Sequence, residues 1–126
     1  MSSHILVIDD DADLRVLVRV ALARLGGYRV DTARNGAEGI AAAKSLRPDI
    51  VLLDMTLPDC EGTDVLRSLA SDRDTKDIIV IILSASASRR SEPELAELGA
   101  AGVIAKPFNP PTLVERVKTI VARVRP

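Results

Sequence analysis

Aromatic residues, cysteine and histidine are almost absent from this chain of 126 residues. It contains no tryptophan and only one residue each of tyrosine, phenylalanine, cysteine and histidine. One cysteine cannot form a disulfide within the chain, which suits a reducing compartment, and we therefore expect a cytoplasmic protein. With only His4 and Cys60 available, the chain also lacks the nitrogen and sulfur ligands of a structural zinc site. The core must be aliphatic.

A dominant charge and a long apolar run are absent as well. The chain has 17 basic and 18 acidic residues, a net charge of −1 with histidine neutral. This balance argues against non-specific binding to nucleic acid or membranes as the main role. No apolar run approaches the roughly 20 residues that a membrane helix needs, and no signal peptide is evident. We expect one soluble domain over residues 1–126, since this length can bury a single core.

What the chain does contain is a regular alternation of short apolar runs with segments of helical periodicity. Residues 50–53 are all apolar and lead into Asp54 and a loop with proline, aspartate and glycine. Such a run predicts a strand buried on both faces of a parallel sheet. The predicted strands are 4–8, 28–33, 50–54, 78–83 and 103–105, and the predicted helices are 11–25, 37–46, 62–71, 93–98 and one from 110. The alternation predicts an α/β fold with a doubly wound, five-stranded parallel sheet.

Reactive side chains lie at the ends of four predicted strands. They are Asp9 and Asp10, then Asp54, Ser84 and Lys106. Open α/β sheets bind ligands at the carboxyl ends of their strands. Grouped carboxylates repel each other by about 1 to 4 kcal/mol per pair, depending on the dielectric, and a hard cation such as Mg²⁺ relieves that repulsion. Carboxylates, a divalent cation, an ammonium group and a hydroxyl together predict a phosphoryl-transfer site with Asp54 as the nucleophile.

These motifs resemble the receiver domain of bacterial two-component response regulators. The matching residues run in order along the whole chain: Asp9-Asp10, Asp54 with Pro58 and Gly62, Ser84-Ala85, and Lys106-Pro107-Phe108. The resemblance implies a flavodoxin-like (βα)5 fold with strand order 2-1-3-4-5, as in a single-domain receiver of the chemotaxis-regulator type. It also implies a cis peptide bond between Lys106 and Pro107.

The resemblance further implies a role for each residue of the site. Asp54 is the implied phosphoacceptor, Lys106 binds a phosphoryl oxygen, and Ser84 occupies the position of the switch hydroxyl. The implied cofactor is Mg²⁺, and its implied ligands are the carboxylates of Asp10 and Asp54, Asp9 through water, and the backbone carbonyl of Thr56.

The implied function is phosphorylation-controlled signalling. The receiver takes a phosphoryl group from the phosphohistidine of a sensor histidine kinase or a histidine phosphotransfer protein, and switches a surface that binds a downstream target protein. Its chemistry is confined to phosphotransfer onto itself and autodephosphorylation, so we do not expect an enzyme that turns over a substrate. We expect a monomer or weak homodimer without direct contact to nucleic acid or membranes.

One position departs from the family pattern. Relatives commonly carry tyrosine or phenylalanine three residues before the lysine, where this chain has Val103, whose stiff side chain is too short for that switch. We hypothesise that the signal leaves through loop 85–91 and the helix after it. A receiver-like scaffold that is never phosphorylated, a phosphorelay intermediate, and the receiver part of a larger regulator or hybrid kinase stay open. A phosphatase with an aspartate nucleophile is rejected, because Thr56 stands where such enzymes need a second aspartate.

Other polar residues near these motifs receive simpler interpretations. Asp11 and Asp13 are expected to cap the first helix, where negative charge is favourable. Asp59 and Glu61 are interpreted as solvating their loop, and Cys60 as an incidental thiol.

Overall fold

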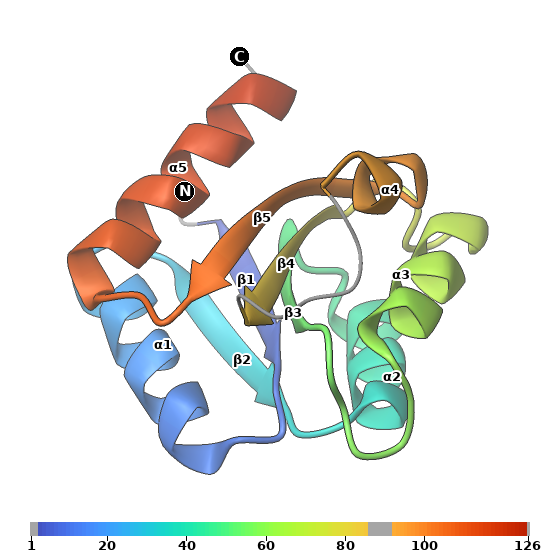
Figure 1. Ribbon diagram of the computed structural model, residues 1–126, viewed down its shortest axis with the longest axis horizontal. Helices are drawn as coiled ribbons and strands as arrows, with labels where there is room; N and C mark the ends of the chain where they lie inside the picture. Colours follow the sequence, from blue (N-terminus) through green and yellow to red (C-terminus); the bar gives the residue numbers. More distant parts are fainter. Residues whose placement is uncertain (1–2, 86–91, 126) are drawn as a thin grey trace.

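The computed structural model describes residues 3–85 and 92–125, which form a parallel sheet between two layers of helices (Figure 1). The sheet has five strands in the order β2-β1-β3-β4-β5, and every neighbouring pair is parallel. The elements are β1 (His4–Ile8), α1 (Ala12–Arg24), β2 (Arg29–Ala33), α2 (Gly36–Leu46), β3 (Ile50–Asp54), α3 (Gly62–Ser71), β4 (Ile79–Ala85), α4 (Glu92–Glu97), β5 (Ala100–Lys106) and α5 (Pro110–Val124). The predicted fold class and strand order are confirmed.

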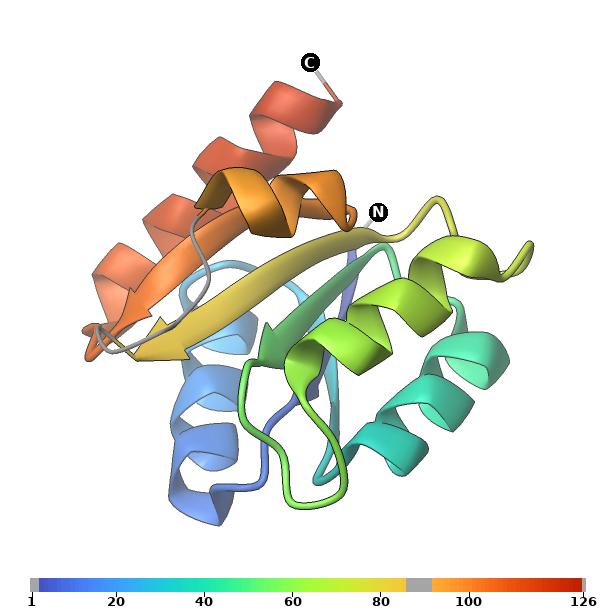
Figure 2. The same cartoon turned by 45° about the vertical axis from the view of Figure 1, so that its right-hand side comes forward.

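The two faces of the sheet are covered by different helices (Figure 2). Helices α1 and α5 cover one face, and α2, α3 and α4 cover the other. Because side chains alternate along a strand, Ile5 and Val7 of β1 pack in the cluster with α1 and α5, whereas Leu6 and Ile8 pack in the opposite cluster. All four are fully buried. Burial on both faces explains why the strands are continuous apolar runs without polar alternation.

Strand β5 is longer than the sequence pattern predicted. It spans Ala100–Lys106, whereas the prediction covered only residues 103–105. Its first three residues are two alanines and a glycine, which are poor strand formers, and their extended conformation comes from pairing with β4. Lys106 is therefore the last residue of β5, at the carboxyl edge of the sheet.

Helix α1 leaves part of its apolar surface uncovered. Asp11 caps it as predicted, because its carboxylate accepts hydrogen bonds from the backbone of the first turn. Leu17 and Leu25 continue the apolar i, i+3, i+4 spacing of this segment, which predicts a buried position for both, yet they are 42% and 56% exposed. The face that packs on the sheet is narrower than the sequence period suggested. The exposed large apolar residues of this region are Val16, Leu17, Val20 and Leu25.

Helix α5 is 15 residues long and begins at two prolines. Proline suits the first turn of a helix, where its missing N–H has no intrahelical partner. Asn109 caps the helix by accepting a hydrogen bond from the N–H of Thr112 at 2.9 Å. Among the residues that the structure describes, no helix combines the length and apolar character needed to span a membrane.

Candidate functional site

Three carboxylates from the ends of two neighbouring strands meet at the carboxyl edge of the sheet. Asp9 and Asp10 follow β1, and Asp54 is the last residue of β3, which pairs with β1. One carboxylate oxygen of each residue lies within 4.8 Å of the others. Asp9 and Asp54 are buried while Asp10 is exposed. The cluster is therefore set into the protein but open to solvent on one side.

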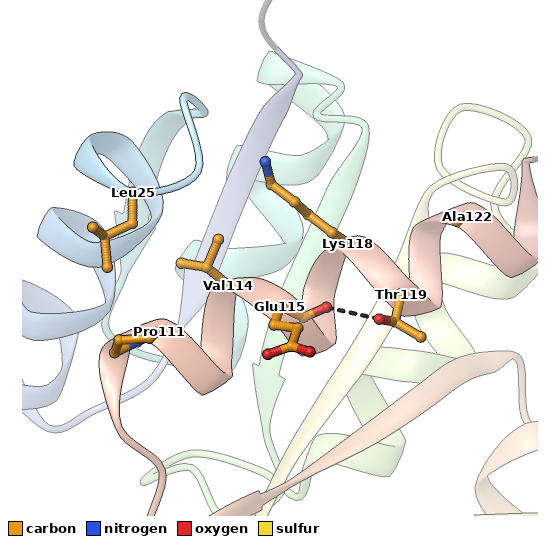
Figure 3. A pocket seen from close by; sticks show the side chains of 7 residues that line it. All are labelled: Leu25, Pro111, Val114, Glu115, Lys118, Thr119 and Ala122. Atoms are coloured by element: carbon orange, nitrogen blue, oxygen red, sulfur yellow. Dashed lines mark hydrogen bonds between the residues drawn. The ribbon is translucent and has the colours of Figure 1, made fainter.

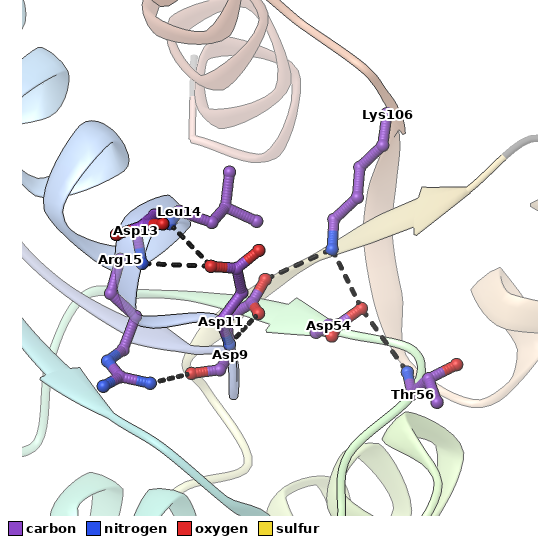
Figure 4. Close-up of polar contacts among 8 residues, drawn as sticks. All are labelled: Asp9, Asp11, Asp13, Leu14, Arg15, Asp54, Thr56 and Lys106. Atoms are coloured by element: carbon purple, nitrogen blue, oxygen red, sulfur yellow. Dashed lines mark hydrogen bonds and ion pairs between the residues drawn. The ribbon is translucent and has the colours of Figure 1, made fainter.

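Lys106 places a positive charge between two of these carboxylates (Figure 4). Its Nζ lies 3.2 Å from Asp9 Oδ2 and 3.2 Å from Asp54 Oδ1. Strand β4 lies between β3 and β5, so the lysine side chain reaches across the end of β4. The side chains of Asp9 and Asp54 are only 1% and 11% exposed. Ion pairs shielded from water in this way are screened much less than surface pairs.

The surroundings raise the pKa values of Asp54 and Lys106 for different reasons. Burial raises the pKa of Asp54 and repulsion from Asp9 adds to it, while attraction to Lys106 offsets only part of the rise. Burial by itself would lower the pKa of Lys106, but the attraction of Asp54 and Asp9 outweighs it, so that pKa is raised. The lysine is a cation at neutral pH. A further cation beside the carboxylates would favour the ionised form of Asp54.

We expect Asp54→Asn to raise the melting temperature of the metal-free protein near neutral pH. A raised pKa means that ionising Asp54 costs more free energy in the folded than in the unfolded chain, and the neutral amide removes that cost. The unfolded chain loses this proton near the ordinary value of 3.8. The parent therefore loses stability relative to the variant as the pH rises from that value through the raised pKa of the folded state.

Melting temperatures in EDTA between about pH 4 and pH 7 check this expectation. The gap between Asp54→Asn and the parent should widen with pH and then level off. Asp77→Asn, which alters an exposed carboxylate, is the control and should show little gap. A gap that stays constant with pH would contradict the assigned cause.

The loop between β3 and α3 folds back against the end of β3. The N–H of Thr56 donates to Asp54 Oδ1 at 3.4 Å, and Thr56 pairs with Glu61 across the loop. The N–H of Gly62 donates to the Met55 carbonyl at 2.8 Å. Gly62 approaches the strand so closely that an added Cβ would lie 2.6 Å from the Asp54 carbonyl oxygen. The start of α3 is thus held directly against the end of β3.

Ser84 lies one residue beyond Leu83, the residue of β4 that pairs with Asp54. It is buried, and its hydroxyl donates to the Ala85 carbonyl at 3.1 Å. Within residues 3–85 and 92–125, no hydrogen bond joins this hydroxyl to Asp54 or Lys106. The structure therefore brings together the three carboxylates and the lysine and leaves the serine at the adjacent strand end. Apart from Ala85, the predicted signalling loop 85–91 lies outside the described residues.

Arg15 contacts the acidic cluster in a way that the sequence pattern does not predict. The Nη1 of this α1 residue donates to the Asp9 backbone carbonyl at 2.8 Å (Figure 4). The N–H of Asp11 donates to Asp9 Oδ1 at 3.0 Å. Together these contacts orient the acidic turn, residues 9–11, from the side opposite Lys106. An arginine inside an amphipathic pattern carries no signal that separates this role from a solvated surface charge.

The interpretation of Asp59 as a solvating loop residue was wrong. Its carboxylate accepts hydrogen bonds from the N–H groups of Gly36 and Ala37, at 2.8 and 2.9 Å. These groups belong to the first turn of α2 and lie more than 20 residues earlier in the chain. Periodicity cannot reveal a contact between a loop and a helix so far apart in sequence.

The expected cis peptide bond between Lys106 and Pro107 is present.

A separate hollow of about 580 Å³ lies between the end of α1 and the outer face of α5, lined by residues that include Leu25, Pro111 and Val114 (Figure 3). None of its lining residues belongs to the acidic cluster. The reactive groups therefore sit at an open sheet edge and not in this hollow.

A doubly wound sheet with three carboxylates and a lysine at its carboxyl edge defines a receiver-like α/β protein. Residues 5–118 match the family described as the response regulator receiver domain. The chain belongs to this family.

Two regulators and one solved structure illustrate the similarity. The chain is 37% identical over 122 residues to the phosphate regulon transcriptional regulatory protein PhoB of Pseudomonas aeruginosa, covering 97% of this chain and 53% of that protein. It is 37% identical over 121 residues to the transcriptional regulatory protein ResD of Bacillus subtilis, covering 96% and 49%. The chemotaxis response regulator CheY4 of Vibrio cholerae superposes with a TM-score of 0.87 at 28% identity, covering 95% of this chain and 99% of that one. The chain spans about half the length of the curated relatives it matches.

Proposed function

We propose that this receiver is a phosphoacceptor in which Asp54 takes a phosphoryl group from the phosphohistidine of a sensor histidine kinase or a histidine phosphotransfer protein. The observation that carries the proposal is the convergence of Asp9, Asp10, Asp54 and Lys106 on one point. In the transfer, a carboxylate oxygen of Asp54 forms a bond to phosphorus while the P–N bond of the phosphohistidine breaks. The imidazole leaves with the electron pair and takes up a proton.

The residues of the acidic cluster fit Mg²⁺. Three carboxylate oxygens within 4.8 Å of one another are the hard ligands that this cation prefers, and it usually retains several waters. Asp10 and Asp54 would bind it directly, Asp9 through water, and Thr56 through its backbone carbonyl. When bound, the cation supplies charge that offsets the negative phosphoryl oxygens.

Lys106 is suited to bind an oxygen of the phosphoryl group that Asp54 receives. Its ammonium is already shared between Asp9 and Asp54, so one of its N–H groups can turn to a phosphoryl oxygen without a large movement of the backbone. Because its pKa is raised, the group is charged when the donor arrives. A preorganised donor aimed at developing negative charge is a major source of rate acceleration.

The exposed apolar side chains of α1 support docking of the phosphodonor protein. The helix starts immediately after the acidic turn, so Val16, Leu17 and Val20 lie on the first element beyond the site. A partner that covers them with apolar surface would gain free energy in proportion to the buried area. It would also bring its phosphohistidine to the open side of the cluster.

The proposed output is a change of binding surface and not catalysis of a further reaction. A phosphoryl group adds roughly 1.5 to 2 negative charges, enough to shift a surface between two conformations. Val103 is half-buried in β5, and the proposed route for the signal is loop 85–91 with α4. We propose a cytoplasmic monomer or weak homodimer whose altered surface a downstream protein binds.

Intact-protein mass after incubation with acetyl phosphate and Mg²⁺ tests the proposed function. We expect one labile phosphoryl adduct in the parent and none in Asp54→Ala or when EDTA replaces Mg²⁺. Acetyl phosphate transfers the group with loss of acetate, so no partner protein is needed. Asp77→Ala, at an exposed position, is the control and should keep the adduct. A folded parent without any adduct would favour the unphosphorylated scaffold.

A further inference from the structure

The loop that connects β3 to α3 is joined to the start of α2 by the carboxylate of Asp59. Oδ1 accepts a hydrogen bond from the N–H of Gly36 at 2.8 Å, and Oδ2 accepts one from the N–H of Ala37 at 2.9 Å. The next N–H, of Glu38, donates to Asn35 Oδ1 at 2.8 Å. All three N–H groups at this helix start are therefore bonded, two of them to a residue from another loop.

This link is strong for an exposed carboxylate. The two N–H bonds to Gly36 and Ala37 hold the pKa of Asp59 below its ordinary value, so the group is ionised at neutral pH. Hydrogen bonds to an ionised acceptor are shorter and stronger than neutral ones, and the start of a helix favours negative charge. Because each oxygen has its own partner, the orientation of the carboxylate is fixed as well as its position.

A close contact between Gly36 and Cys60 reinforces the link. A Cβ added at Gly36 would overlap Cys60 Sγ and lie 3.2 Å from Asp59 Oδ1. The absence of a side chain at this position therefore lets the loop lie directly against α2.

The anchored loop is the one that follows Asp54. The N–H of Leu57 donates to the Cys60 carbonyl at 3.2 Å, which closes the loop on itself. At its inner end the N–H of Thr56 donates to Asp54 Oδ1 at 3.4 Å. The loop thus has one end on the phosphoacceptor and its outer corner on α2. A shift of Asp59 would be passed through this closed turn to Thr56.

We propose that Asp59 is a positioning residue for the site at Asp54, acting by tying the β3–α3 loop to α2 so that the Thr56 carbonyl and the Asp54 carboxylate are held ready for Mg²⁺. This inference rests on the proposed function and adds a role for a residue that contacts neither the cation nor the phosphoryl group. Mg²⁺ demands near-ideal octahedral geometry. Residues that orient metal ligands typically change affinity by about 10- to 100-fold. We expect the lower end of this range, since Asp59 acts through a backbone ligand.

The test measures the Mg²⁺ dissociation constant by titration calorimetry on the metal-free protein, and amide hydrogen exchange at Thr56 without metal. Asp59→Ala should weaken Mg²⁺ binding about 10-fold and speed exchange at Thr56. Asp59→Asn, whose single carbonyl oxygen can replace only one of the two acceptors, should lie between Asp59→Ala and the parent.

Asp72→Ala is the matched control. The Asp72 carboxylate also accepts a backbone N–H, from Asp74 at 2.8 Å, and pairs with Lys44 at 3.1 Å. It lies at the C-terminal end of α3, whereas the site is at the N-terminal end. This variant should lose comparable stability while its Mg²⁺ affinity and the exchange at Thr56 stay as in the parent.

A second pair of variants displaces the loop while Asp59 is kept. Gly36→Ala places a methyl group against Cys60 and should weaken Mg²⁺ binding in the same direction as Asp59→Ala. Adding Cys60→Ala removes the overlapping sulfur and should restore most of the affinity. Recovery in the double variant would separate displacement of the loop from a general loss of folding.

Parent-like Mg²⁺ affinity and exchange in Asp59→Ala, alongside a loss of stability similar to that of Asp72→Ala, would overturn the inference and leave Asp59 as a helix cap. Failure of the parent itself to bind Mg²⁺ would overturn both this inference and the proposed metal site. The two failures are distinguished by the parent titration alone.

Discussion

Lys106→Met is expected to lose stability and, under the proposed function, to form the phosphoryl adduct more slowly. The change leaves Asp9 and Asp54 facing each other with side chains 1% and 11% exposed and without their shared cation. Removing one partner of a buried ion pair costs about 3 to 5 kcal/mol, and we expect the lower end because the lysine side chain is 25% exposed. Loss of one donor to the phosphoryl oxygens should slow adduct formation by about 100- to 1000-fold.

Urea unfolding and the rate of adduct formation with acetyl phosphate check both parts. Lys44→Met is the control, since its pair with Asp72 is 48% and 28% exposed and such surface pairs contribute about 0 to 1 kcal/mol. The double variant Asp54→Asn/Lys106→Met should regain part of the lost stability, because it removes one of the unpaired carboxylates. Equal stabilities of Lys106→Met and Lys44→Met would contradict the inferred strength of the buried pair.

Among substitutions that add one methyl group near the site, Gly62→Ala is expected to cause the largest loss of stability. The added Cβ would lie 2.6 Å from the Asp54 carbonyl oxygen and 2.9 Å from the Met55 Cα. Both neighbours are backbone atoms at the end of a buried strand, so relief requires movement of α3 away from β3. Overpacking of this kind costs about 1 to 3 kcal/mol, and the movement would also displace the loop that follows Asp54. Adduct formation should slow together with the loss of stability.

Gly102→Ala is a matched control for the same addition. Its Cβ would lie 2.7 Å from Ile120 Cδ1, 3.0 Å from Cγ1 and 3.2 Å from Cγ2, nearly the same shortest distance, but these neighbours belong to one side chain and not to the backbone. A shift of the Ile120 side chain can relieve part of that contact, and alanine suits a strand better than glycine does. Urea unfolding of the two variants should show the larger loss for Gly62→Ala. A larger loss for Gly102→Ala would mean that the start of α3 yields more easily than the β5–α5 contact.

The sequence predicted which carboxylates gather at one edge of the sheet, because there the chemistry lies next to a clear structural pattern. Asp9, Asp10 and Asp54 each follow an apolar run, and the ends of parallel strands must meet at one edge. Prediction was weaker where local preference and tertiary pairing disagree, as in the first residues of β5. It failed for Arg15 and Asp59, whose partners are backbone groups that carry no residue-specific signal.

The layer architecture and the groups at the carboxyl edge follow from the order of residues alone. Strands buried on both faces must be apolar throughout, and such short apolar runs can be recognised directly in the sequence. Three contacts come instead from the folded arrangement: Lys106 reaches across β4 to two carboxylates, Ser84 donates to a neighbouring carbonyl, and Asp59 ties its loop to α2. These contacts depend on strand register and on the packing of segments that are distant in sequence. No local sequence pattern indicates them, because they form only when the chain has folded.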